Sequence, residues 1–225
     1  GASWREHRKV CIFDLEKKLE KARCRAGEDE DAIGDACFNL GNLYQRHDRL
    51  GEAEEKYLEL LEISVVARAL VSMRLGEIYF QQGKLDDALG MFKRALRVYR
   101  RVLGDEQVDV AKAFVDIGIV LYQKGELDRA MAKYEQAREM YCRLVGEDHE
   151  RVADVLSDVA TVLVDQGKDA EAMAMREKAL GIDRRTLGSD SDGVADSLQN
   201  LGTSYQTQGK LEEALAKYEE ALGIV

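Results

Sequence analysis

The segment LGEIYFQQGKLDDALGMFKRA, residues 75–95, decides the fold of this chain. Gly76 is followed seven positions later by Gly83, five positions after that by Ala88, and four positions later by the ring of Phe92. Glycine tolerates the left-handed conformation that ends a helix, so Gly83 predicts a break between two helices. Small residues on both helices let the backbones approach closely, and the ring fills the gap between them. The segment therefore predicts a helical hairpin.

The same pattern recurs in five copies along the chain. Its first small residue recurs at positions 41, 76, 118, 160 and 202, in steps of 35, 42, 42 and 42 residues. The turn residue and the alanine after it recur in every copy, whereas Arg176 replaces the ring in the fourth copy. A single hairpin cannot bury its apolar face, so neighbouring hairpins are expected to stack.

These residues resemble tetratricopeptide (TPR) repeats, with L-G-x-x-Y, then Q-G-K-L, then A-x-x-x-[YF]-x-x-A. The usual period is about 34 residues, and the longer step here comes with related connectors that begin at Leu103, Val145 and Leu187. These connectors resemble those of kinesin light chains and nephrocystin-type proteins, although Val108, Glu150 and Asp192 stand where that subclass has proline. The resemblance implies an all-α fold: a right-handed α-solenoid of about five helix-turn-helix hairpins plus an N-terminal helix.

The resemblance also divides the chain into parts. Residues 1–3 (Gly-Ala-Ser) look like a cloning scar. Residues 4–26 form an amphipathic segment, which is either a helix that caps the first repeat or an autoinhibitory or partner-docking helix. The array is expected over 29–225, with repeats at about 34–63, 69–103, 111–145, 153–187 and 195–225. The sequence ends within an apolar helical pattern at Val225, so we expect a fragment of a longer protein.

Composition excludes several classes of function. The chain has 33 Lys and Arg against 43 Asp and Glu, a net charge of −10, which disfavours nucleic-acid binding. No apolar run approaches the ~18 residues of a membrane span, so no membrane insertion is expected. There is no proline, which removes proline-rich ligand segments from consideration. The four cysteines form no C-x-x-C pair and predict reduced thiols in a cytoplasmic protein.

No pattern of catalytic residues stands out. The sequence lacks G-x-x-x-x-G-K-[ST], G-x-G-x-x-G, H-E-x-x-H and G-x-S-x-G, and its three histidines lie far apart. Paired carboxylates such as Asp86-Asp87 begin second helices, where the helix dipole favours acids. We therefore expect no enzyme, no cofactor and no metal site. The basic run from Lys93 to Arg101 is either a solvated face or a docking patch for anions.

Binding is the function that the resemblance implies, because stacked TPR hairpins line a concave groove with their first helices. Repeats 2 and 3 place apolar residues toward the groove, which are either an anchor pocket or ordinary packing between hairpins: Met73, Phe80, Ile119 and Tyr122. Repeats 4 and 5 place acidic residues there, which either attract a basic partner or serve solubility: Asp154, Asp158, Asp165 and Asp196. The candidate partner-binding residues are Asn39, Asn42, Met73, Arg74, Phe80, Lys112, Asp116, Ile119, Tyr122, Asp154, Asp158, Asp165, Asp196 and Asn200.

Two familiar TPR ligand sites are incomplete in this sequence. The clamp for the C-terminal carboxylate of heat-shock chaperones keeps Asn42 and Lys112, but Phe38, Arg74 and Asp116 replace its other residues. The asparagine ladder of kinesin light chains, which grips a peptide backbone, is interrupted as well. Neither ligand class is expected.

The sequence thus predicts a non-enzymatic protein-protein interaction scaffold or adaptor. Its partner would be a protein or peptide segment, basic and with an apolar anchor, held in the groove. The alternative is a structural module that self-assembles through its exposed terminal helices, which would make a homo-oligomer. A motor or cargo adaptor role rests on the long-repeat resemblance alone.

Overall fold

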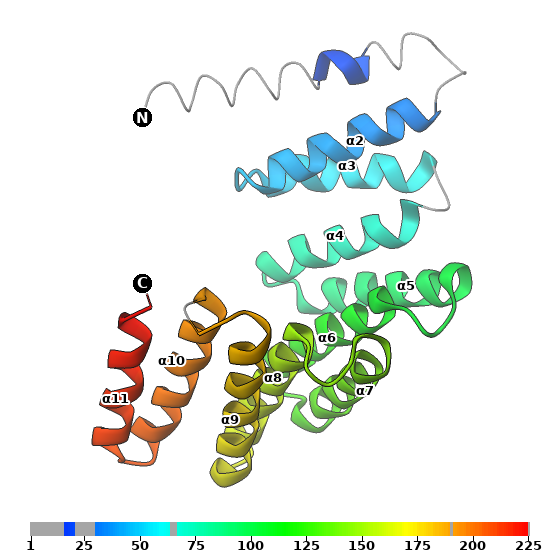
Figure 1. Ribbon diagram of the computed structural model, residues 1–225. Helices are drawn as coiled ribbons and strands as arrows, with labels where there is room; N and C mark the ends of the chain where they lie inside the picture. The colour runs from blue at the N-terminus through cyan, green and yellow to red at the C-terminus, as the bar shows by residue number, and fades with distance from the viewer. Residues whose placement is uncertain (1–15, 21–29, 64–66, 190, 225) are drawn as a thin grey trace, which may run out of the picture. The chain divides into compact units, whose positions relative to one another are not determined.

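The computed structural model describes residues 16–20, 30–63, 67–189 and 191–224 (Figure 1). Besides a short helical stretch at 16–20, these residues form ten helices and no strand. The helices are α2 (Glu30–Gln45), α3 (Leu50–Ile63), α4 (Ala67–Gln81), α5 (Leu85–Leu103), α6 (Val108–Gln123), α7 (Leu127–Val145), α8 (Glu150–Asp165), α9 (Asp169–Thr186), α10 (Asp192–Thr207) and α11 (Leu211–Leu222).

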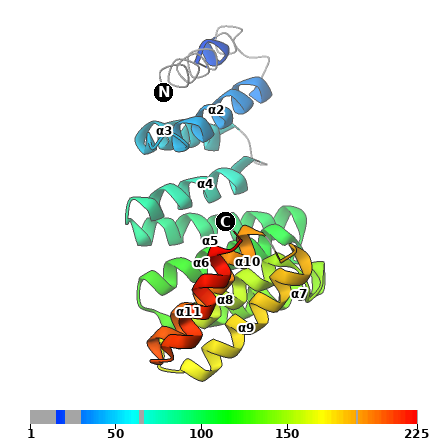
Figure 2. The ribbon, with the colours of Figure 1, turned by 60° about the vertical axis from the view of Figure 1, so that its left-hand side comes forward.

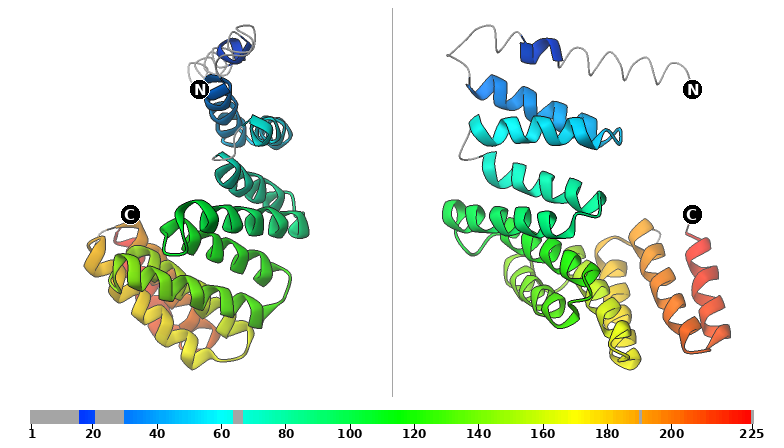
Figure 3. Two further views of the ribbon diagram at one scale, coloured as in Figure 1. Left: turned by 90° about the vertical axis from the view of Figure 1, so that its right-hand side faces the viewer. Right: turned by 180° about the vertical axis from the view of Figure 1, so that it is seen from behind.

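Consecutive helices pair as antiparallel hairpins, α2 with α3 and so on to α10 with α11 (Figures 1 and 3). The chain divides into two compact units at residue 102, the first with the hairpins α2–α3 and α4–α5 and the second with the three hairpins from α6 to α11. The all-α hairpin architecture expected from the repeat pattern is confirmed.

Each first helix ends in the same turn. In the third repeat, Gly125 adopts a φ of 75°, and the next amide, that of Glu126, donates to the carbonyl of Leu121 over 2.9 Å. This bond from residue i to i−5 is the signature of a Schellman motif, which needs a residue in the left-handed conformation. Four of the five turns place glycine there, and only the first uses another residue, Asp48 at φ 56°.

The glycine of L-G-x-x-Y lies directly under the ring of the second helix. A Cβ built on Gly41 would stand 2.6 Å from the ring of Tyr57, and one on Gly76 would stand 2.6 Å from the ring of Phe92. Real Cβ atoms do not approach other atoms so closely. The ring therefore occupies the space that the missing side chain leaves, which explains why the two residue types recur together.

The fourth repeat departs from this pairing at both positions. Ala160 replaces the glycine and Arg176 replaces the ring. The Arg176 guanidinium turns toward the next hairpin, where it donates to the carbonyl of Asn200 over 3.0 Å and to the hydroxyl of Ser204. The arginine that replaces the ring thus links α9 to α10.

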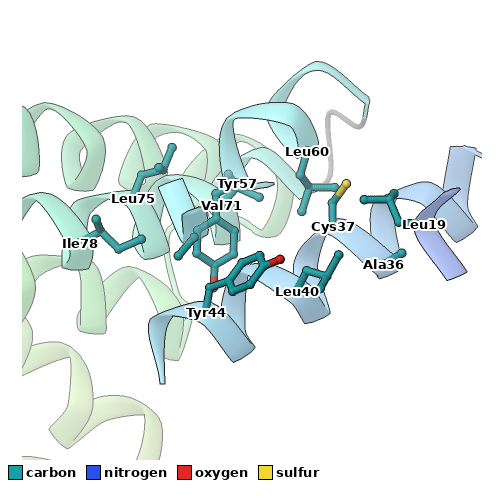
Figure 4. Packing of buried hydrophobic residues seen from close by; sticks show 11 residues of the cluster. Leu19, Ala36, Cys37, Leu40, Tyr44, Tyr57, Leu60, Val71, Leu75 and Ile78 are labelled. Carbon is teal, nitrogen blue, oxygen red and sulfur yellow. The ribbon is translucent and has the colours of Figure 1, made fainter. Parts of the chain in front are cut away.

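The core of the first unit runs between its hairpins (Figure 4). Tyr57, Leu40 and Leu75 are fully buried there, and Leu19 of the short helical stretch joins the same cluster at 3% exposure. The Tyr44 hydroxyl also donates to the Glu16 carboxylate of that stretch. The remainder of the amphipathic segment 4–26 lies outside the described residues.

The second unit is built from α6 to α11, with the second helix of each hairpin packed on the first helix of the next (Figure 2). Leu156 of α8, Ile182 of α9 and Leu198 of α10 are fully buried between these helices. Burial of such side chains contributes about 1.5–3 kcal/mol each, so the stacking of hairpins is the main source of stability.

Two of the three long connectors end in a residue whose side chain caps the next first helix, whereas Gln107 before α6 makes no such bond. His149 caps α8 by accepting from the amide of Arg151 over 3.2 Å, and Ser191 caps α10 by accepting from the amide of Val194 over 3.4 Å. Val108, Glu150 and Asp192, which replace the prolines of the related connectors, are the first residues of their helices. Proline is favoured at this position because the amide there has no partner within the helix, but other residues are accepted as well.

Candidate functional site

An acidic pocket opens between α8 and α10 in the second unit. Its volume is about 440 Å³, and five carboxylates line it without any Lys or Arg among the lining residues. α8 contributes four residues, α10 contributes four, and the end of α9 and the connector after it contribute two. The lining residues are Glu150, Asp154, Ser157, Asp158, Asp183, Leu187, Gly193, Asp196, Ser197 and Asn200.

The repeat register brings the carboxylates together. Asp154 and Asp158 are one helical turn apart on α8, and the equivalent pair 42 residues later is Asp196 and Asn200 on α10. Residues four apart share one face of a helix, so two stacked first helices present two such pairs to the same space. The structure thus places three of the four predicted acidic residues in one pocket.

Asp165 is the predicted acidic residue that lies elsewhere. It ends α8 and does not line the pocket. Its carboxylate instead accepts a hydrogen bond from the hydroxyl of Tyr122 on α6, and this bond raises the pKa of Tyr122. The geometric reason is distance along the helix, because Asp165 lies about two turns beyond Asp158.

Of the two pocket carboxylates that the sequence analysis missed, Glu150 begins α8 and is exposed, whereas Asp183 is buried. It comes from the second helix α9, is 6% exposed, and accepts a hydrogen bond of 2.5 Å from the hydroxyl of Ser197 on α10. A signal was present in the sequence, since the equivalent residues of α5 and α7 are Tyr99 and Tyr141. α9 thus carries a carboxylate where α5 and α7 carry a tyrosine, and this carboxylate bonds to Ser197 of α10.

The acids of the pocket repel one another. Burial raises the pKa of Asp158 to about 7, and the neighbouring charges of Asp154 and Asp116 add to the effect. Although Asp154 is exposed, the pocket wall partly desolvates its carboxyl and raises its pKa, and repulsion from Asp183 and Glu150 raises it further.

Burial also raises the pKa of Asp183, although the bond from Ser197 opposes this shift. Both burial and like charges disfavour the ionised form, so these groups would be stabilised by a cation.

The predicted basic residues are already neutralised by acids on their own helices. Arg74 of α4 forms an ion pair of 2.9 Å with Glu77, and Lys112 of α6 forms one of 3.3 Å with Asp116. These pairs are partly exposed and contribute little to stability. The lining of the acidic pocket, by contrast, contains no Lys or Arg.

The predicted apolar anchors are distributed over both units. In the first unit Met73 is only 3% exposed, so it belongs to the interior and a partner cannot reach it, whereas Phe80 is half-buried. In the second unit Ile119 and Tyr122 are half-buried on α6. Interior packing, one of the two interpretations left open above, thus describes Met73.

The asparagines fall into two groups. Asn39 and Asn200 are exposed on α2 and α10. Asn42 is half-buried and accepts a hydrogen bond of 2.8 Å from the hydroxyl of Tyr57, so its side-chain oxygen is occupied within the hairpin. Asn200 lines the acidic pocket.

No cluster of three or more His, Cys, Asp or Glu side chains among the described residues has the arrangement of a metal site. Within the same residues, no helix combines the length and the apolar character needed to cross a membrane.

The sequence matches profiles of the tetratricopeptide repeat over most of its length. One profile covers residues 65–143 and 151–225, and a second covers residues 36–65; both describe a repeat and not an enzyme. No curated protein matches the chain.

Solved structures share the fold. BtubC (BKLC) from P. vanneervenii superposes with a TM-score of 0.82 at 24% identity, over 96% of this chain and 90% of its own. A kinesin-light-chain-like protein of Podosopora anserina with nearly identical TPR-like repeats gives 0.73 at 18% identity, over 88% and 96%. YrrB, a TPR protein with an unusual peptide-binding site, gives 0.55 at 23% identity, over 93% and 91%. The chain belongs to the tetratricopeptide repeat family, and its structural neighbours include TPR arrays of the kinesin-light-chain type.

Proposed function

We propose that this chain is a non-enzymatic interaction scaffold that binds a basic segment of a partner protein in the acidic pocket between α8 and α10. TPR proteins typically mediate contacts between proteins, and YrrB is described by its peptide-binding site. The observation that carries the proposal for this chain is the 440 Å³ pocket with five carboxylates and no basic lining residue.

A Lys or Arg side chain fits this pocket electrostatically. Its charge would relieve the repulsion among Asp154, Asp158 and Asp183, whose pKa values are all raised. Hydrogen bonds between charged groups contribute about 1.5–3 kcal/mol each, roughly twice as much as neutral ones. A partner with two basic residues could engage the α8 pair and Asp196 together.

An apolar anchor near the basic residues completes the proposed ligand. Ile119 and Tyr122 of α6 are half-buried and belong to the same unit as the pocket, so they are the candidate contacts for this anchor. We also place the protein in the cytoplasm, because Cys37 and Cys142 are free thiols.

The test is a peptide selection against the purified chain at low and high salt. We expect enrichment of peptides with Lys or Arg beside one apolar residue, and loss of binding at high salt because exposed charges are screened. Selected peptides should bind Asp158→Lys at least tenfold more weakly. Glu177→Lys is the matched control, since it makes the same charge change at an exposed residue of α9 outside the pocket. Equal weakening by both variants would contradict a specific site.

A second candidate function, self-assembly, is favoured by the exposed face of α11. Leu215 and Leu222 are 57% and 74% exposed, whereas the equivalent Met173 and Leu180 of α9 pack against α10. The same face could be covered by a second copy of the chain. Light scattering should then report a mass that rises with concentration, and the double change Leu215→Gln with Leu222→Gln should abolish that rise.

A further inference from the structure

A second pocket lies between the second helices α7 and α9 and is closed at its base by the end of α8. Its volume is about 350 Å³, and it shares no lining residue with the acidic pocket. Its apolar lining consists of Met131, Ala132, Val159, Leu163 and Met175. The polar lining consists of Asp128, Glu135, Arg138, Gln166, Lys168 and Glu171.

The second repeat places a tyrosine at this position, as the first and fifth do, whereas the third and fourth repeats have leucine there. Leu163 is the fifth residue of the L-G-x-x-Y pattern, and its equivalent in the second repeat is Tyr79. Tyr79 packs against the core of the first unit, and its hydroxyl donates over 2.9 Å to Glu54 of the preceding second helix. The ammonium group of Lys84 lies 5.4 Å from the centre of the Tyr79 ring.

The fifth repeat repeats this arrangement. Tyr205 packs against the same cluster as Met173 of the preceding second helix α9. The ammonium group of Lys210 lies 5.8 Å from the centre of the Tyr205 ring. Two repeats, one in each unit, thus seat a tyrosine between consecutive second helices and beneath a lysine.

The fourth repeat keeps the surroundings of this seat without the ring. Met131 occupies the position of Glu54 and Met173, and Lys168 occupies that of Lys84 and Lys210. Leu163 is 6% exposed, and its short side chain ends at the base of the pocket. Lys168 makes no ion pair and no ring contact with any described residue.

We propose that this pocket receives an aromatic side chain of a partner protein, seated between α7 and α9 as Tyr79 and Tyr205 are seated in their own repeats. The proposal rests on the vacant ring position over Leu163 and does not depend on the acidic pocket. The bound ring brings its face to the Lys168 ammonium and its edges to the thioethers of Met131 and Met175.

General physical chemistry supports this occupant. Apolar cavities of about 150 Å³ bind benzene, so a 350 Å³ pocket has room for a larger phenol ring. Sulfur and aromatic groups attract one another, and a cation over the face of a ring adds a further attraction. An aliphatic side chain would gain the apolar burial without either of these terms.

The first test uses p-cresol, the side chain of tyrosine, and the methyl resonances of the six methionines. We expect saturable shifts at Met131 and Met175, and none at Met173, where Tyr205 already fills the equivalent seat. 4-Methylcyclohexanol, which has a similar shape and no aromatic face, should bind several-fold more weakly. Absence of shifts with p-cresol, or equal binding of both compounds, would overturn the proposal.

Two variants locate the binding. Leu163→Tyr supplies the ring from within, so the Met131 and Met175 shifts should disappear and the melting temperature should rise. Lys168→Gln should weaken p-cresol several-fold, whereas Lys178→Gln, a change of an exposed lysine of α9 outside the pocket, should not. Retained p-cresol binding in a folded Leu163→Tyr protein, or equal effects of the two lysine changes, would refute the assignment of the seat.

A peptide selection separates a partner protein from a free aromatic compound. Peptides that bind the native chain and are lost on Leu163→Tyr should share one Tyr, Phe or Trp. If p-cresol binds but no such peptides are enriched, the pocket serves a small molecule and the proposed protein partner is wrong.

Discussion

The ring of Tyr134 lies so close to Gly118 that a Cβ on Gly118 would stand 2.7 Å from the ring's Cε1 atom. Gly118 belongs to α6 and Tyr134 to α7, so this contact sets how closely the two helices of the third hairpin approach. The same relationship recurs in the first, second and fifth hairpins.

We expect Gly118→Ala to destabilise the protein, because the added methyl group must displace the ring. Overpacking of this kind costs about 1–3 kcal/mol, which outweighs the gain of up to ~1 kcal/mol from better helix propensity. Gly90→Ala is the control, since a Cβ there meets nothing within 4 Å, and it should stabilise the protein. Urea unfolding measures both changes, and a stabilising Gly118→Ala would contradict the packing argument.

The fourth hairpin allows a double-mutant cycle. Arg176→Tyr alone should cost about 2 kcal/mol, because the new ring meets the Cβ of Ala160 and the bonds to Asn200 and Ser204 are lost. Ala160→Gly alone should cost about 1 kcal/mol through helix propensity.

The double variant should be more stable than the sum of the single changes by about 1 kcal/mol, since removal of the methyl group makes room for the ring. Additive effects within ~0.3 kcal/mol would show that positions 160 and 176 do not couple.

Asp158 makes stability fall as the pH rises. Burial and repulsion raise its pKa from 3.8 to about 7 in the folded state, so the folded protein binds more protons than the unfolded chain between these values. The free energy of unfolding therefore decreases as the pH rises through this window. Asp158→Asn should flatten that decrease, as measured by urea midpoints at pH 5 and pH 8, and an unchanged decrease in this variant would contradict the assignment to Asp158.

In the turn of the first hairpin, Asp48 adopts the left-handed conformation with φ at 56°, where the other four hairpins have glycine. A side chain in this conformation costs roughly 1 kcal/mol, partly offset by the greater freedom of glycine in the unfolded chain. Asp48→Gly should therefore stabilise the protein by about 0.5 kcal/mol, and Gly125→Ala should destabilise it by about 1 kcal/mol. Thermal unfolding that gives both changes the same sign would contradict this account.

Much of the candidate site was predictable because the repeat register fixes which residues share a helix face. Asp154, Asp158 and Asp196 were expected to lie together on this ground, and they line one pocket. Asp165 was assigned to the same surface but does not line the pocket. A periodic pattern predicts which face of a helix a residue lies on, but it does not predict how far along the helix a pocket extends. Met73 was expected in the groove and is interior, because its neighbours cover it.

The role of Asp183 and the pocket over Leu163 could not be predicted from the sequence, because each pocket is formed by residues from three helices. Asp183 belongs to a second helix, and its position against Ser197 follows from how α9 packs on α10. The Leu163 pocket lies between α7 and α9 at a position where other repeats carry a tyrosine, and a hydrophobic pattern does not distinguish leucine from tyrosine.

The sequence by itself determined the hairpins, their turns and the pairing of a glycine with a ring, because these depend on residues within one repeat. Only the tertiary structure decided where charge and empty space collect. A pocket is formed by side chains from consecutive repeats, and its size and electrostatics depend on distances between helices that no local pattern encodes.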